Sequence, residues 1–96
     1  MTMTTYDRWL DAYSVAYDTV HEPFEIPCPH CGSTRLRLVF TGNPESDVGY
    51  AHFWCDHCLY GIGVSRTVIP DGAVVQDIRQ VSAERQPSIP NYRLIR

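Results

Sequence analysis

The sequence contains no lysine, and its eight arginines are outnumbered by eleven aspartate and glutamate residues. The formal net charge is therefore −3 at pH 7. A protein that binds nucleic acid usually carries a positive surface that displaces counterions from the phosphates. The field of this whole chain would instead repel a phosphate backbone. Nucleic acid is thus disfavoured as a partner unless a local basic surface overcomes that field.

Long hydrophobic runs and a secretion signal are also missing. No window reaches the roughly eighteen apolar residues that a membrane-spanning helix needs, so we expect no membrane partner. The first residues, Met1–Asp7, lack the basic start and apolar run of a signal peptide. We therefore expect a cytoplasmic protein, whose thiols stay reduced. With 44% hydrophobic residues over 96 positions, we expect one folded domain, 1–96.

Only four cysteines are present, and they form two Cys-x-x-Cys pairs, Cys28 with Cys31 and Cys55 with Cys58. Two intervening residues allow one tight turn to aim both thiolates at a single ion about 2.3 Å away. The segment between the pairs is long enough for a hairpin that brings the second turn beside the first. The pattern predicts one Zn²⁺ held by all four sulfurs. Such a site is structural, because no coordination position remains for water or substrate.

Three other uses of paired cysteines compete with zinc binding. Disulfides need an oxidising compartment, which the N-terminus does not support. A thioredoxin-like redox site needs one Cys-x-x-Cys pair in a parallel α/β unit. Iron remains the rival metal, because four thiolates hold iron equally well. His30 and His57 occupy matching places within the two pairs, and we expect both to face solvent because four cysteine ligands suffice.

The region before the cysteines has the periodicity of an amphipathic helix over residues 4–21. Thr4 can cap its start, with Asp7 three residues later, and Pro23 should end it. Aromatic and apolar residues recur there at steps of three and four. This face either packs onto the rest of the domain or docks a partner or a second copy. It comprises Tyr6, Trp9, Leu10, Tyr13, Tyr17 and Val20.

Residues 26–81 alternate in the manner of a small antiparallel sheet of three to four strands. Strands are expected at 35–40, 48–54, 63–69 and 73–81. Turn-forming residues at 41–47 and 70–72 separate them. Residues 82–96 are expected to form an irregular tail, with Tyr92–Ile95 as the place for a short extra strand.

Residues 26–80 resemble the zinc-ribbon family, in which two knuckles with four cysteines in all are carried on a small antiparallel sheet. The first knuckle, residues 28–32, is similar to that of rubredoxin, whereas the second lacks the matching proline and glycine. The resemblance implies a small α+β fold, here with an N-terminal helix added to the ribbon. A narrower likeness is to the ribbon of transcript-cleavage elongation factors, because Glu45 and Asp47 lie in the hairpin loop. That family's acids are adjacent, whereas Ser46 separates these two.

No catalytic constellation is apparent, so the sequence favours a non-enzymatic zinc-ribbon protein that interacts with another protein, as a monomer or weak homodimer. A rubredoxin-like iron electron carrier is one alternative. The other is a nucleic-acid-binding or transcription-associated ribbon, because arginines interleaved with aromatic rings can stack bases and pair phosphates. The residues that would form this face are Arg35, Arg37, Arg66, Tyr50, His52 and Trp54.

Overall fold

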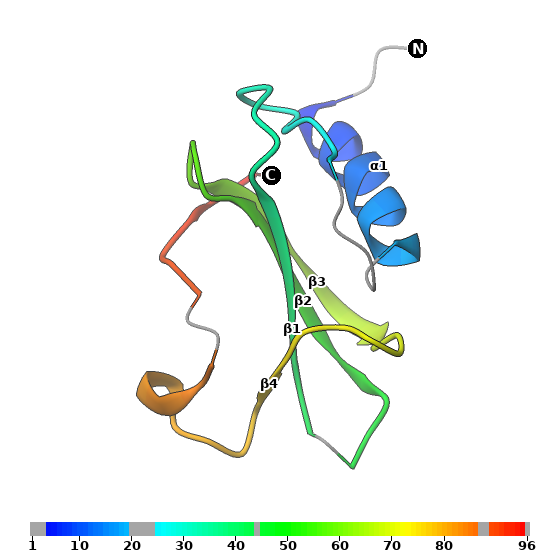
Figure 1. Cartoon of the computed structure of the whole chain (residues 1–96), viewed down its shortest axis with the longest axis vertical. Helices are drawn as coiled ribbons and strands as arrows, with labels where there is room; N and C mark the ends of the chain where they lie inside the picture. Colours follow the sequence, from blue (N-terminus) through cyan, green and yellow to red (C-terminus); the bar gives the residue numbers. More distant parts are fainter. Residues whose placement is uncertain (1–3, 20–24, 44, 87–88, 96) are drawn as a thin grey trace.

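The computed structural model describes residues 4–19, 25–43, 45–86 and 89–95. It is a small α+β structure in which one N-terminal helix lies against a mixed five-stranded sheet (Figure 1). The strands are ordered β4-β1-β2-β3-β5 across the sheet. The elements are α1 (Thr5–Asp18), β1 (Leu36–Gly42), β2 (Val48–Cys55), β3 (Tyr60–Val68), β4 (Val75–Asp77), a 3₁₀ turn (Ser82–Glu84) and β5 (Arg93–Leu94).

Helix α1 starts where the sequence predicts. The Thr4 hydroxyl accepts a hydrogen bond from the Asp7 amide at 3.1 Å, and the Asp7 carboxylate accepts one from the Thr4 amide at 3.2 Å. This reciprocal capping box satisfies two amides that have no partner within the helix. The helix ends at Asp18, and the predicted end near residue 21 lies outside the described residues. Within the described ranges, no helix has the length and apolar character needed to cross a bilayer.

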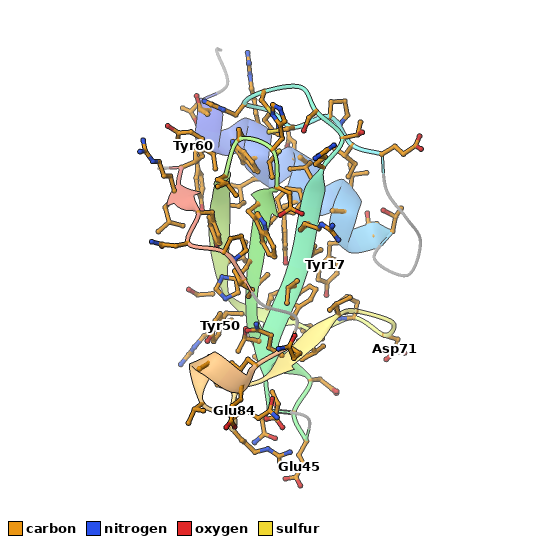
Figure 2. The ribbon with its side chains drawn as sticks, turned by 60° about the vertical axis from the view of Figure 1, so that its left-hand side comes forward. Tyr17, Glu45, Tyr50, Tyr60, Asp71 and Glu84 are labelled. Carbon is orange, nitrogen blue, oxygen red and sulfur yellow. The ribbon has the colours of Figure 1, made fainter. Side chains whose placement is uncertain are left out.

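The aromatic face of α1 packs on the sheet. Of the two roles expected for this face, packing onto the rest of the domain is therefore the one observed. Trp9 is fully buried and meets Phe53 edge-on, with ring centroids 5.8 Å apart. The Tyr17 hydroxyl, labelled in Figure 2, donates a 2.6 Å hydrogen bond to the Val68 carbonyl. The helix is therefore anchored to β2 and β3 by apolar contact and by this polar tether.

The three central strands are antiparallel, as predicted, with Leu38 opposite Phe53 and Phe53 opposite Ile62. Alternate residues of these strands face α1 and form the main core. Val39 points to the other face and is nevertheless only 5% exposed. The strand expected to be half-buried is thus also covered on its second face at Val39, whereas Arg37 on that face is exposed as expected.

The prediction of a purely antiparallel sheet is wrong at the two edge strands. Both β4 and β5 pair in parallel, with β1 and β3 respectively. The turn at 70–72 does not close a hairpin, and the Ile69 side chain before it lies near Gly42 and Gly49 of the β1–β2 hairpin. A Cβ at these glycines would lie 2.8 and 3.0 Å from Ile69 Cδ1, so a side chain there would have to displace the end of the Ile69 side chain. At Gly49 the Thr41 carbonyl oxygen would be closer still. The chain then reaches the free edge of β1, where β4 covers only Val75–Asp77 instead of 73–81.

The C-terminal segment contains more regular structure than an irregular tail. It holds the 3₁₀ turn, and β5 lies within the Tyr92–Ile95 stretch that the sequence marks for a short strand. The Tyr92 hydroxyl lies 3.0 Å from His52 Nδ1, on the sheet face opposite α1. This segment therefore covers part of the sheet face opposite α1.

Candidate metal centre

The four cysteine thiols converge at one end of the sheet. Cys28 Sγ lies 3.7 Å from Cys58 Sγ, and Cys31 Sγ lies 3.7 Å from Cys55 Sγ. All four sulfurs lie within 4.8 Å of one another. A tetrahedron with Zn–S bonds of about 2.3 Å has edges of about 3.8 Å. The sulfurs are thus spaced to surround one ion, and all four cysteines are free rather than joined in disulfides.

Pairing of β1 with β2 brings the two knuckles together. Leu36 at the start of β1 is the partner of Cys55 at the end of β2. The Asp56 amide then donates a 2.9 Å hydrogen bond to the Arg35 carbonyl, which extends the pairing into both turns. The position of the site follows from the hairpin register, as the spacing of the cysteine pairs indicates.

Backbone amides in both turns point at sulfur. The His30 and Cys31 amides donate to Cys28 Sγ at 3.3 and 3.4 Å, and the His57 amide donates to Cys55 Sγ at 3.3 Å. The Ser33 hydroxyl lies 3.3 Å from Cys55 Sγ. Such contacts stabilise thiolates more than neutral thiols, because the acceptor then carries charge. Contacts of this kind support the thiolate, which is the form of cysteine that binds a metal ion.

The residue after each knuckle takes a left-handed backbone. Gly32 has φ of 79° and Leu59, in the matching place, has φ of 57°. The Gly32 amide donates to the Cys28 carbonyl and the Leu59 amide to the Cys55 carbonyl, both at 2.9 Å. Glycine adopts this region freely, whereas leucine is strained there. The two turns are thus near copies in geometry although the second lacks the glycine.

The pKa values of the cysteines in the cluster are shifted in opposite directions. Hydrogen bonds from the backbone and hydroxyl of Ser33 lower the pKa of Cys31 to about 5. Burial instead raises the pKa of Cys58 to about 12 and raises that of Cys28. Four thiolates at such distances repel one another, so full deprotonation needs a compensating positive charge. A divalent cation would supply that charge.

A carboxylate in the second knuckle braces the site, and sequence reasoning missed it. Asp56 accepts hydrogen bonds from Arg37 Nε at 2.7 Å and from Trp54 Nε1 at 2.8 Å. Trp54 is 3% exposed, so its indole N–H needs this partner. From the sequence, Asp56 could have been connected with these two residues only through the register of the β1–β2 hairpin, which places Arg37 opposite Trp54.

The two knuckle histidines lie outside the thiol cluster. His30 and His57 are both exposed, as expected. The His30 ring lies against Tyr60 with centroids 4.2 Å apart, and the Arg93 guanidinium lies 6.0 Å from the centroid of the same ring. Tyr60 therefore links the first knuckle to the start of β3 and to β5.

Two other sets of residues were singled out by the sequence, and their positions are as follows. On the face expected to stack nucleic-acid bases, Tyr92 stacks on Trp54 with ring planes 8° apart. Glu45 and Asp47 are exposed in the β1–β2 loop, at the end of the molecule away from Tyr60 and the first knuckle (Figure 2).

No family model, curated protein or solved structure matches the chain.

Proposed function

We propose that Cys28, Cys31, Cys55 and Cys58 hold one structural zinc ion, and that the protein is a non-enzymatic module that binds another protein. The observation that supports the metal is the set of sulfur separations, which match the edges of a tetrathiolate site. The amide and hydroxyl contacts to sulfur give the same support. Four sulfurs fill a tetrahedral coordination shell, so zinc here offers no position for a substrate.

The role proposed for the ion is to hold the fold. Structural zinc contributes roughly 10–16 kcal/mol of apparent binding free energy in small peptides. The net stability of a whole domain is usually only about 5–15 kcal/mol. Loss of the ion should therefore unfold residues 28–81 or leave them without fixed packing. Reduced cysteines of this kind fit a cytoplasmic location, which belongs to the same proposal.

Metal content and stability together test the proposal. We expect one zinc per chain by elemental analysis, and loss of the folded circular-dichroism signal on complete chelation. Cys31→Ser should reproduce that loss, whereas His57→Gln, in the other knuckle but outside the thiol cluster, should retain both metal and fold. A thermal melt unchanged by complete metal removal would refute the structural role. A red protein with visible absorption would identify iron and favour the rubredoxin-like alternative.

A further inference from the structure

The outer edge of β3 is paired only at its start. The Arg93 amide donates to the Leu59 carbonyl and the Ile95 amide to the Gly61 carbonyl, both at 2.8 Å. Alternate residues of a strand direct their backbone groups to the same side. Gly63 and then Ser65 therefore direct their backbone groups to the same edge of β3 that β5 covers at Tyr60 and Gly61. Among the described residues, no strand pairs with β3 at this edge beyond Gly61.

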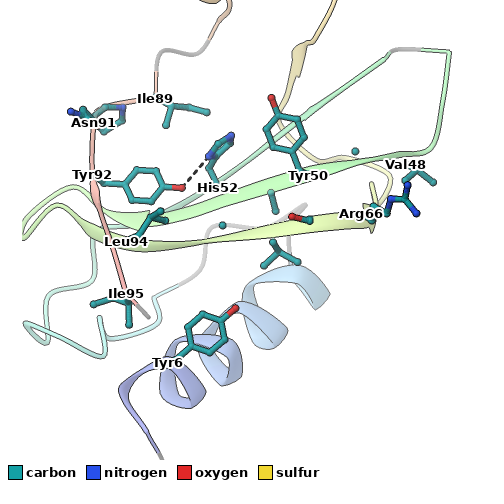
Figure 3. A pocket seen from close by; sticks show the side chains of 16 residues that line it. Tyr6, Val48, Tyr50, His52, Arg66, Ile89, Asn91, Tyr92, Leu94 and Ile95 are labelled. Carbon is teal, nitrogen blue, oxygen red and sulfur yellow. Dashed lines mark hydrogen bonds between the residues drawn. The ribbon is translucent and has the colours of Figure 1, made fainter.

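A groove of about 810 Å³ runs along this open edge. Figure 3 shows Leu94 and Ile95 at one end and Arg66 with Val48 at the other. Tyr6 of α1 lies on one side of the strand and Tyr92 on the other. The groove thus continues the path of β5 along β3, and its width is bounded by aromatic rings.

Among the described residues that line the groove, Arg66 is the one with a charged side chain. None of the lining residues is acidic, in a chain whose acids outnumber its arginines. Arg66 is exposed, and no ion pair within the described part of the chain involves it. Its φ of 49° lies at an irregularity in the β2–β3 register, where the strand bends. A carboxylate on an occupant would complement this end of the groove.

We propose that the groove binds an extended segment of a protein partner, added to β3 as a strand in line with β5. The segment would carry apolar side chains at alternate positions and an acidic residue beside Arg66. Strand addition supplies main-chain hydrogen bonds, and flanking pockets select the side chains. A second copy fits less well, because a two-fold pairing of these short edges would bring two Arg66 side chains close together. The inference deepens the protein-binding role proposed above, and rests on it.

Gly63 provides the decisive substitution. A Cβ there would meet only the Ala51 carbonyl oxygen, at 3.9 Å, so small side chains are accommodated. Gly63→Pro removes the amide that faces the groove while leaving the hydrogen bonds to β2, since proline is tolerated on strand edges. Gly63→Ala keeps the amide and is the matched control. Arg66→Asn removes the charge and suits the left-handed backbone.

The experiment pans a random decapeptide library displayed on phage against the full chain loaded with zinc. Selected peptides are then synthesised and titrated by fluorescence anisotropy. We expect alternating apolar residues with a carboxylate, and a loss of affinity of about tenfold or more in Gly63→Pro, the scale of one or two hydrogen bonds. Gly63→Ala should bind within a factor of about three of wild type, consistent with an added methyl that meets no close neighbour. Arg66→Asn should lose the preference for acidic peptides.

Two further measurements distinguish a failure of the groove proposal from a failure of the metal proposal. Zinc content and circular dichroism are measured on every variant, so that a misfolded Gly63→Pro is identified, and Ser65→Pro against Ser65→Ala then repeats the comparison. A folded zinc protein that enriches no peptide, or peptides indifferent to both prolines, would overturn the groove and leave the metal proposal intact. A protein without metal that still selects edge-dependent peptides would support the groove and overturn the metal proposal.

Discussion

The phenol ring of Tyr92 lies flat against the indole of Trp54, with ring centroids 5.8 Å apart and ring planes 8° from parallel. The Tyr92 hydroxyl also lies 3.0 Å from His52 Nδ1 and donates to the Ile62 carbonyl at 3.4 Å. One side chain thus joins the C-terminal segment to two central strands. The sheet face opposite α1 depends on this contact for its cover.

Tyr92→Ala should release the C-terminal segment and lower the free energy of unfolding by about 2 kcal/mol, since it removes a large aromatic contact. Tyr92→Phe keeps the ring and should cost only about 1 kcal/mol, the scale of one hydrogen bond. Urea titrations followed by tryptophan fluorescence measure both, because Trp54 becomes exposed in the alanine variant. Equal stability of the two variants would contradict a role for the ring stack.

His52 should make stability depend on pH. Burial, with the nearby charge of Arg85, lowers the pKa of His52 below its usual value. As the pH falls below about 6.5, the unfolded chain takes up a proton before the folded one does, so stability is lost. The loss is complete once the pH has passed the lowered folded pKa.

Urea unfolding at pH 7.5 and at pH 5.5, with excess zinc, measures this difference. We expect His52→Gln to lose less stability between the two values than the wild type does. His57→Gln, at an exposed position in the second knuckle, is the matched control substitution. An identical pH response in His52→Gln and the wild type would remove His52 as the cause.

Sequence patterns anticipated the parts of the structure that depend on neighbours along the chain. The Thr4 cap and the helix face follow from periodicity and turn residues. The antiparallel pairing of β1 with β2, and of β2 with β3, follows from the same signals. The convergence of the thiols follows from the spacing of two turns joined by one hairpin. Parallel β4 was not foreseen, because local periodicity marks a strand but does not say which edge of the sheet it joins or in which direction. Likewise, the contact between Asp56 and Trp54 depends on which side chains the register brings together.

Asp56→Ala should destabilise the protein by roughly 2–3 kcal/mol, because it leaves the buried Trp54 N–H without a partner. Arg37→Ala removes the other partner, but that pair is well exposed and should cost less than about 1 kcal/mol. A double-mutant cycle with Trp54→Phe isolates the indole contact. If Asp56→Ala cost the same in the Trp54→Phe background as in the wild type, the carboxylate would not act through the indole.

The two left-handed residues after the knuckles should respond in opposite ways to substitution. Gly32→Ala should cost about 1 kcal/mol, the usual penalty for an L-residue in this region. The added Cβ has nothing within 4 Å, so the cost reports the backbone alone. Leu59→Gly should relieve strain of similar size at the matching position.

Leu59 is 42% exposed, so its loss removes little packing. Leu59→Ala is the matched control, because it deletes the same side chain while keeping the strained backbone. We expect Leu59→Gly to be more stable than Leu59→Ala by up to about 1 kcal/mol in urea titrations of the zinc-loaded protein. Glycine normally lowers stability relative to alanine by increasing the freedom of the unfolded chain, so this reversed order would require a left-handed backbone at Leu59. The ordinary order, with alanine more stable, would show that the second knuckle does not repeat the geometry of the first.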